Sequence, residues 1–326
     1  MTDWHGKPYY SLDAYCKNTF HHKCYKIALN AHMTCPNRDG TLGVRGCIFC
    51  KDGSGEFAVK LPFPAYDDAS RRTENADAFA DIDGQLRAGI SLFGDKCVGE
   101  HFIAYFQAYT NTYAPLPYLE AVYRCALNHS QVCGISIATR PDCINPEIIQ
   151  LLLRLKDEYS PKFIWVELGL QTIHDATADY IRRGYPLPVF ENALHLLSDA
   201  GIPAIVHVIL GLPRENPEMQ LQTIDYLSQL RPFGVKLQLL HVLEGTDLAL
   251  DYQEGNFQVL SQEDYLTLLA ECIARLHPDI VIHRLTGDGA KKDLIAPLWS
   301  TNKREVLNSL HHKLKVEGIW QGMCCR

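Results

Sequence analysis

The chain has 326 residues, 47% of them hydrophobic, which is enough for a large core. It has no apolar run of the roughly 18 residues that a membrane helix needs, and its N-terminus lacks the apolar stretch of a signal peptide. The net charge of −7 argues against strong non-specific nucleic-acid binding. We therefore expect a cytoplasmic protein with no membrane partner, whose twelve cysteines bind metal or act in catalysis rather than form disulfides.

The first predicted strand, Tyr25–Asn30, leads into a polar, glycine-rich loop that contains Cys35, Cys47 and Cys50. Four thiolates would close a metal site, whereas three leave one position open for a ligand that is not protein. On spacing alone, the loop fits a 4Fe–4S cluster, and it also fits a zinc site completed by a histidine. The candidate histidines are His21, His22 and His32.

The stretch 53–68, rich in glycine, proline and alanine, is predicted to be mobile, and a helix is expected at about Asn75–Leu92. From residue 100 onward, apolar runs that read as buried parallel strands alternate with helical segments. The predicted strands are Phe102–Tyr109, Cys133–Thr139, Phe163–Leu170, Ala204–Leu210, Val235–Val242 and Ile280–Leu285. The predicted helices are Leu116–Asn128, Glu147–Tyr159, His174–Arg183, Val189–Ala200, one from Asn216 to Leu230, and Tyr265–Leu276.

Six βα units and a seventh strand predict an α/β fold with a parallel sheet. Our first hypothesis is a partial (βα)6-type TIM barrel, an open parallel sheet with outer helices, and the second is a doubly wound sheet. We expect this core to span residues 25–290, between an N-terminal extension, 1–24, and a C-terminal extension, 291–326. Chemistry in such folds sits at the carboxyl ends of the strands, which is where the cysteine loop lies.

A first strand, a loop with three cysteines and an aromatic residue, Phe49, before the last of them, followed by βα units, resembles the radical S-adenosylmethionine (SAM) superfamily. The resemblance implies that Cys35, Cys47 and Cys50 hold a 4Fe–4S cluster whose fourth iron binds SAM. One electron then splits SAM to a 5′-deoxyadenosyl radical, which abstracts hydrogen from a substrate. It also implies an electron donor such as flavodoxin or ferredoxin.

The eleven residues between Cys35 and Cys47 depart from the usual short spacing and are similar to the branch of the elongator catalytic subunit. The phrase Cys35-Pro-Asn-Arg-Asp-Gly resembles the YhcC-like proteins of the superfamily. Ala138-Thr-Arg-Pro-Asp-Cys143 resembles a segment of the elongator subunit. Further segments resemble that subunit and oxygen-independent coproporphyrinogen oxidase, namely Glu167-Leu-Gly-Leu-Gln171-Thr, Arg183-Gly184-Tyr and Gly211-Leu-Pro213.

By this resemblance, Gln171 would contact the ribose of SAM and Arg183 its carboxylate, since guanidinium groups match carboxylates. His207 occupies a strand end used for the same ligand, although a core histidine fits equally well. The usual Gly-Gly-Glu after the second strand of the barrel is replaced here by Gln107–Thr112. The remaining predicted cofactor-binding residues are Phe49, Thr110, Asn111 and Arg140, with a solvent-facing polar strand end as the alternative for Thr110 and Asn111.

The sequence identifies no catalytic residue, and the candidates are Cys143, at a strand end, and Tyr109, one of several aromatic residues of which at least one should line the cavity. Cys16 and Cys24 lie near His21 and His22, so a second metal site is an alternative to core packing there.

The favoured hypothesis is a radical SAM enzyme whose substrate is a small metabolite or RNA. The alternatives are a zinc-binding or RNA-binding module and an iron–sulfur sensor without radical catalysis. The sequence indicates neither the oligomeric state nor the hydrogen that is abstracted.

Overall fold

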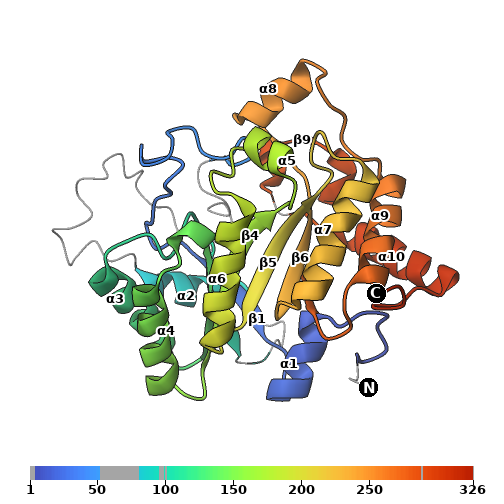
Figure 1. Cartoon of the computed structure of the whole chain (residues 1–326). Coiled ribbons are helices and arrows are strands. Elements are labelled where there is room, and N and C mark those ends of the chain that lie inside the picture. Colours follow the sequence, from blue (N-terminus) through green and yellow to red (C-terminus); the bar gives the residue numbers. More distant parts are fainter. Residues whose placement is uncertain (1–3, 52–80, 95–98, 100, 288, 326) are drawn as a thin grey trace.

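Seven parallel strands form one curled sheet, in the order β1-β2-β3-β4-β5-β6-β8 (Figure 1). This computed structural model describes residues 4–51, 81–94, 99, 101–287 and 289–325, so the stretch 53–68 and the start of the helix predicted from Asn75 lie outside the described residues. The strands are β1 Tyr25–Leu29, β2 Phe102–Phe106, β3 Val132–Thr139, β4 Phe163–Gln171, β5 Ala204–Leu210, β6 Gly234–Leu239 and β8 Val281–Arg284. All six neighbouring pairs are parallel.

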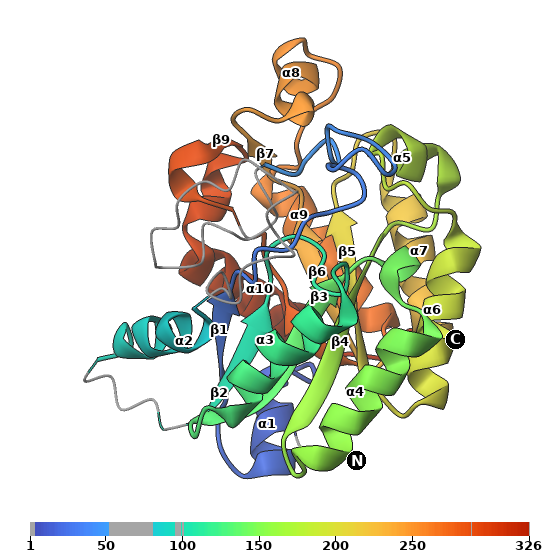
Figure 2. The ribbon, with the colours of Figure 1, turned by 90° about the vertical axis from the view of Figure 1, so that its left-hand side faces the viewer.

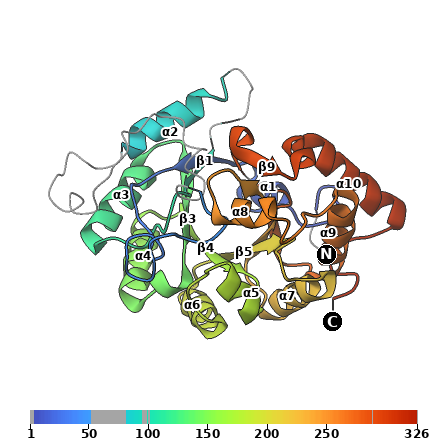
Figure 3. The same cartoon turned by 90° about the horizontal axis from the view of Figure 1, so that it is seen from above.

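The helices that follow the strands cover the outer side of the curled sheet (Figure 3). They are α2 Ile82–Ser91, α3 Leu116–Asn128, α4 Pro146–Glu158, α5 Asp175–Tyr180, α6 Leu187–Asp199, α7 Pro217–Leu230 and α9 Gln262–Arg275. Side-chain caps fix several starts, because Asn145, Asn216 and Ser261 each accept a hydrogen bond from the backbone three residues on. The partial (βα)6-type TIM barrel is therefore confirmed, and the doubly wound alternative is wrong.

The observed elements differ from the predicted ones mainly at the carboxyl ends of strands. The strand predicted to reach Tyr109 ends at Phe106, and Tyr109 adopts a left-handed backbone with φ of 63°. The run predicted as one strand to Val242 is split between β6 and a short strand, β7 Val242–Leu243. This short strand pairs antiparallel with β9, Leu294–Ala296, so the chain leaves the barrel there. These departures widen the barrel at the end that carries the cysteine loop.

A helix that the sequence did not predict, α1 Leu12–Phe20, covers the amino ends of the strands (Figure 2). Its Tyr15 ring lies 4.9 Å from Phe233 and 5.9 Å from Trp165, measured between ring centroids. We call Leu12, Tyr15, Phe20, Trp165 and Phe233 the aromatic plug, since they pack in one apolar cluster. The plug fills the barrel at this end.

The described segments nearest the two chain ends meet at the plugged end of the barrel. The Gln321 side chain accepts a hydrogen bond from the backbone N–H of Tyr10 and donates to the carbonyls of His277 and Ile280, each at 2.8 Å. Ahead of it, α10 Lys303–Glu317 packs on α9, whereas α8 Asp247–Gln253 lies at the opposite, open end. Each helix in the described part of the chain is too short or too polar to cross a bilayer.

Candidate functional site

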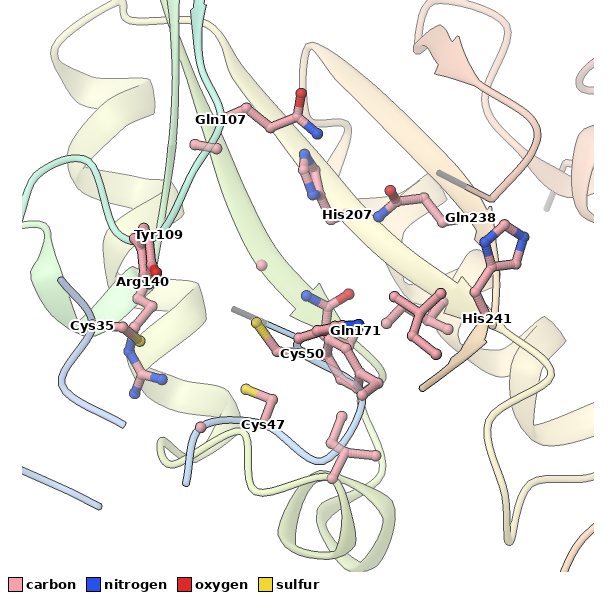
Figure 4. A pocket seen from close by; sticks show the side chains of 18 of the residues that line it. Cys35, Cys47, Cys50, Gln107, Tyr109, Arg140, Gln171, His207, Gln238 and His241 are labelled. Atoms are coloured by element: carbon pink, nitrogen blue, oxygen red, sulfur yellow. The ribbon is translucent and has the colours of Figure 1, made fainter. Parts of the chain in front are cut away.

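The three loop cysteines line one cavity of about 390 Å³ at the carboxyl ends of the strands (Figure 4). The same cavity is lined by most of the residues predicted to bind the cofactor, which are Phe49, Thr110, Arg140, Gln171, Arg183 and His207. Tyr109, a candidate catalytic residue, also lines it, as does Tyr105. The structure therefore brings together residues from the loop and from the ends of four strands.

Polar contacts hold the cysteine loop, in addition to the packing of Ile48 in a buried apolar cluster with Ile181. The Asn37 side chain donates to the carbonyl of Arg182 at 2.7 Å and to Sγ of Cys47 at 3.5 Å. Its backbone carbonyl accepts from Gly46 at 2.7 Å, and the Arg38 guanidinium donates to the carbonyl of Cys50. The loop is thus tied to itself and to the turn after α5.

Gly184 allows the closest approach of this turn to the loop. It has φ of 82°, and a Cβ there would lie 2.7 Å from Oδ1 of Asn37 and 3.2 Å from Nη2 of Arg140. A larger residue would be strained in this backbone conformation and would also push Asn37 away. The glycine of the Arg183-Gly184-Tyr segment therefore sets the distance between the cysteine loop and Arg183.

Burial raises the pKa of the Cys47 thiol to about 12, and the Cys50 and Cys35 thiols add to this increase. A thiolate there needs positive charge to offset its desolvation, which iron would supply. Across the described residues, no three His, Cys, Asp or Glu side chains are placed to hold a single metal ion. His21 and His22 precede β1 and lie at the plugged end, and His32 does not line the cavity, so the arrangement does not favour the zinc hypothesis.

At the cavity wall, the buried atoms Oε1 of Gln171 and Nη2 of Arg183 have no hydrogen-bond partner among the described residues. The rest of the Arg183 guanidinium is fixed, because it donates to the carbonyls of Leu170, Thr172 and Tyr185. Gln171 has φ of 67°, a backbone strain that is common at functional sites. Since an unpaired buried polar group is costly, both atoms are suited to a polar ligand in the cavity.

Arg140 and Asn111 are engaged within the protein. Arg140 forms a two-pronged ion pair with Asp142, at 2.9 and 2.7 Å, and donates to the carbonyl of Arg183 at 3.0 Å. Asn111 is fully buried outside the cavity lining, where its amide donates to the carbonyls of Phe106 and Ala138. Both residues hold strand ends in place, and their predicted contact with a cofactor stays a prediction.

The two candidate catalytic residues lie in different places. Tyr109 lines the cavity, whereas Cys143 lies in a short turn, Pro141–Cys143, and is not among the lining residues. Burial, followed by the Asp142 carboxylate, raises the pKa of the Cys143 thiol to about 12. Its carbonyl accepts a hydrogen bond from Thr112 at 2.8 Å, so the turn supports the end of β3. A catalytic role for either residue stays a prediction.

A group of charged residues inside the barrel was missed by the sequence analysis. Glu167, which is fully buried, accepts hydrogen bonds or ion pairs from four side chains. Its partners are Lys26 at 2.5 Å, Ser136 at 2.5 Å, His207 at 2.6 Å, and Lys236. We call these five residues together with Tyr105 the charged layer. A lysine in the middle of an apolar strand run was the available signal, because a buried lysine requires a partner.

His207 belongs to this charged layer. Burial, together with the neighbouring Lys236 ammonium, lowers the pKa of His207 to about 4 despite its contact with Glu167. The imidazole is therefore neutral at pH 7. Its predicted contact with the cofactor stays a prediction, although it does line the cavity.

Comparison with known proteins gives two family matches and several relatives. The Radical SAM superfamily matches residues 44–227, and the Radical SAM C-terminal domain matches residues 232–316. The uncharacterized protein YtqA of Bacillus subtilis is 37% identical over 317 residues, which cover 97% of this chain and 92% of that protein. Protein YhcC of Escherichia coli K12 is 32% identical over 297 residues, which cover 91% and 89% of the two chains.

Solved structures of similar fold include an Elp3 protein. It is the Elp3 protein of the archaeon Methanocaldococcus infernus with an N-terminal deletion, with a TM-score of 0.65 at 16% sequence identity. The similarity covers 91% of this chain and 64% of that one, so this chain spans less than two thirds of the Elp3 chain.

Proposed function

The chain belongs to the radical SAM superfamily, and we propose that it is an enzyme that uses a 4Fe–4S cluster and SAM to start radical chemistry on its substrate. One observation carries this proposal. Three cysteines line the same cavity as Gln171 and Arg183, whose buried Oε1 and Nη2 atoms lack partners. A 4Fe–4S cluster would use the three cysteines and leave one iron open for SAM. SAM would in turn use the two side chains, Gln171 and Arg183.

These residues fit the cofactors by their chemistry. Cys35, Cys47 and Cys50 supply three thiolates for the cluster. When bound, the cluster and SAM supply one-electron cleavage of the sulfonium and a 5′-deoxyadenosyl radical that abstracts hydrogen from the substrate. The role of the chain is to bind, orient and shield these groups.

Arg183 would hold the carboxylate of SAM with the one guanidinium nitrogen that the backbone carbonyls leave unused. Gln171 would hold a ribose hydroxyl with Oε1. The Arg183 guanidinium is held by backbone carbonyls before the ligand arrives, so its binding to the carboxylate costs little side-chain ordering. Phe49 packs beside Ile48 and Ile181 at the edge of the cavity and would keep water from the cluster.

The partners of such an enzyme follow from the same proposal. A reducing protein such as flavodoxin or ferredoxin would deliver the electron. The substrate would be a small molecule or an RNA, and the relatives identified above do not decide between them because YtqA is itself uncharacterized.

Anaerobic purification and cluster reconstitution test the proposal directly. We expect a brown protein that absorbs at about 400 nm and contains about four irons per chain. After reduction with dithionite, it should release 5′-deoxyadenosine from SAM. A colourless protein with one zinc would contradict the proposal. A complete cluster without 5′-deoxyadenosine would instead favour an iron–sulfur sensor.

A matched pair of variants tests the SAM contacts separately from the cluster. Arg183→Met removes the proposed carboxylate contact, and Arg154→Met removes an exposed arginine from the outer helix α4. We expect Arg183→Met to retain iron but to raise the Kd for SAM by about tenfold or more, and Arg154→Met to change neither. Unchanged SAM affinity in Arg183→Met would remove this residue from the proposed site.

A further inference from the structure

The inward-facing side chains of the barrel form three successive layers. The lowest contains Ile103, Trp165 and Ile205. Trp165 belongs to the aromatic plug, and the other two residues pack in the same cluster. The charged layer lies above it, two residues further along each strand, as in the step from Trp165 to Glu167. The third layer includes Gln107 of the segment after β2, Gly169 of β4 and Gln238 of β6, all of which line the cavity. The charged layer is therefore the floor of the cavity.

The floor holds more basic than acidic side chains. Two lysines, Lys26 and Lys236, share the single carboxylate of Glu167, and His207 is neutral. Their side chains are 17%, 2% and 0% exposed for Lys26, Lys236 and Glu167, so water does little to offset the imbalance. Burial lowers the pKa of Lys236 well below its ordinary value, which reflects the cost of this unmatched charge. A negative group that enters the cavity would offset it.

Tyr105 connects this charge to the cavity. Its hydroxyl accepts a hydrogen bond from Nζ of Lys236 at 2.9 Å, and the Lys236 ammonium lies 4.2 Å from the centroid of its ring. A hydroxyl that accepts from an ammonium becomes a stronger donor itself, because hydrogen bonds in a chain polarise one another. Tyr105 lines the cavity, whereas neither lysine does. A ligand would therefore contact the phenol and experience the charge behind it.

Polar side chains surround the space above Tyr105. The Gln107 amide faces the cavity, and within the described residues its side chain makes no hydrogen bond (Figure 4). Gln238 faces it from β6 and accepts a weak hydrogen bond from Arg284 at 3.5 Å, which leaves its amide N–H groups to donate. Gly169, which has no side chain, borders the same space. Amide N–H groups, a phenol and a guanidinium are donors, as an oxyanion requires, and the Glu167 carboxylate, which lines the same cavity, is paired with Lys26 and Lys236.

We propose that the inner end of the cavity, bounded by Tyr105, Gln107, Gln238 and Arg284, binds the carboxylate or phosphate of a small-molecule substrate. We call these four residues the inner pocket. Its role in substrate recognition rests on the proposed function, whereas the binding of an anion does not. The pocket lies at the bottom of a cavity of about 390 Å³ that is filled below by the aromatic plug, and it is reached from the cysteine side. A compact anion fits this depth better than the backbone of an RNA.

Anion binding is tested with the full chain, reconstituted and supplied with SAM. The probes are succinate and inorganic phosphate, each titrated by calorimetry at constant ionic strength. We expect at least one probe to bind once per chain. Tyr105→Phe, which keeps the ring and removes the hydroxyl, and Lys236→Met should each raise its Kd by about tenfold. Lys315→Met, on the exposed side of α10, should leave the Kd unchanged. Equal affinity in all four proteins, or no binding of either probe, would overturn the proposal.

Gln107→Leu keeps the test decisive if Lys236→Met folds poorly. Because the Gln107 side chain makes no hydrogen bond within the described residues, its replacement leaves no unpaired group, and the variant should fold while losing affinity by about threefold to tenfold. Urea unfolding of Lys236→Met gives an independent readout. Removal of the unmatched charge should leave stability unchanged or raised, whereas a purely structural lysine would make this variant less stable with unchanged anion affinity.

The substrate class is tested by 5′-deoxyadenosine release with fractions of a cell extract. A stimulation of release by the small anionic fraction, lost in Tyr105→Phe, is the expected result. Stimulation by purified tRNA, or by a neutral or cationic fraction, would overturn the assignment of substrate class. No release with any fraction would contradict the proposed function alone, since the calorimetry with succinate and phosphate is independent of radical chemistry.

Discussion

Each end of the barrel carries a group of cysteines, but the surroundings of the two groups differ. At the open end, Cys35, Cys47 and Cys50 line a cavity and belong to a loop held by polar contacts. At the plugged end, three further cysteines pack near the aromatic plug, and these are Cys16, Cys24 and Cys133. The difference teaches that a group of cysteines is a candidate metal site when a cavity lies beside it, and that the number of cysteines alone does not identify one.

At the plugged end the thiols interact mainly with one another and with the backbone. Sγ of Cys133 lies 3.8 Å from Sγ of Cys24 and 3.1 Å from the carbonyl of Phe102, to which it donates. The contact with Cys24, followed by burial, raises the pKa of the Cys133 thiol. Nδ1 of His22 lies 3.6 Å from Cys24, but within the described residues no three such groups are placed to hold one ion. The second metal site considered from the sequence is therefore not supported, and packing accounts for these cysteines.

The largest expected effect separates the two cysteine sets. Cys47→Ala should abolish cluster assembly, because two thiolates cannot replace three in holding a 4Fe–4S cluster. Cys24→Ala should retain about four irons per chain, and Cys143→Ala should retain the cluster and affect turnover at most. Iron analysis and absorbance after anaerobic reconstitution make the comparison. Equal iron loss in Cys47→Ala and Cys24→Ala would mean that the ligands are misassigned.

The second largest expected effect is on the free energy of unfolding, and it tests whether the plugged end stabilises the fold. Trp165 is 1% exposed, and its ring stacks on Phe163 at 4.1 Å. Trp165→Ala should lower the free energy of unfolding by about 3–5 kcal/mol, because it leaves a cavity in the plug. Trp320→Ala, at a residue that is 54% exposed, should change it by less than about 0.5 kcal/mol. Urea unfolding measures both.

Iron content in the same two variants sharpens the comparison between the ends. We expect folded Trp165→Ala to bind as much iron as Trp320→Ala, since the plug lies below the charged layer and away from the cysteine loop. Selective loss of iron in Trp165→Ala at a temperature where it stays folded would show that the two ends are coupled.

Much of the barrel could be predicted because its strands are local patterns. Ala204–Leu210 is an uninterrupted apolar run, and its limits match β5. Asn145 before Pro146 marks the start of α4, where the Asn145 side chain accepts a hydrogen bond from the N–H of Ile148. The cysteine loop was equally local. In contrast, α1 and α10 lie outside the repeating βα pattern, and the signal for each is a short amphipathic stretch without a neighbouring strand.

The parts of the site that could not be predicted depend on contacts between distant strands. Glu167 meets Lys26 and Lys236 only when the sheet curls, and nothing local to these residues indicates which of them pair. The direction of a side chain that follows a strand also depends on contacts with distant parts of the chain. The left-handed backbone at Tyr109 turns the chain there, and Asn111 then points into the protein instead of into the cavity. Sequence resemblance placed Gln171 and Arg183 at the cavity, whereas it did not indicate the direction of Asn111.

The charged layer between the two ends predicts a dependence of stability on pH. His207 has a pKa of about 4 in the folded protein and about 6.5 when unfolded, so between these values the unfolded chain binds more protons. Stability contributed by the neutral imidazole is therefore lost as pH falls from about 6.5 toward 4. From pH 7 to pH 5 we expect the wild type to lose about 2 kcal/mol more than His207→Gln.

Urea unfolding at the two pH values measures this difference. Glu167 should add little over the same range, because the Lys236 and Lys26 ammonium groups outweigh burial and keep its pKa well below the ordinary value, so its contribution is lost only at lower pH. The control is the exposed His195→Gln, which should lose as much stability as the wild type. Identical losses in wild type and His207→Gln would indicate that folding does not lower the pKa of this imidazole.

The smallest effect compares two glycines, one at each end of the barrel. Gly184 and Gly318 both have positive φ, of 82° and 64°, so alanine should cost about 1 kcal/mol of stability at each. Only at Gly184 would the new Cβ meet other atoms, Oδ1 of Asn37 at 2.7 Å, whereas Gly318 has nothing within 4 Å. Gly184→Ala should therefore also displace the cysteine loop from Arg183 and raise the Kd for SAM by about tenfold, measured by equilibrium dialysis on the reconstituted protein. Equal SAM affinity in the two variants would show that the contact between Asn37 and the turn does not position the loop.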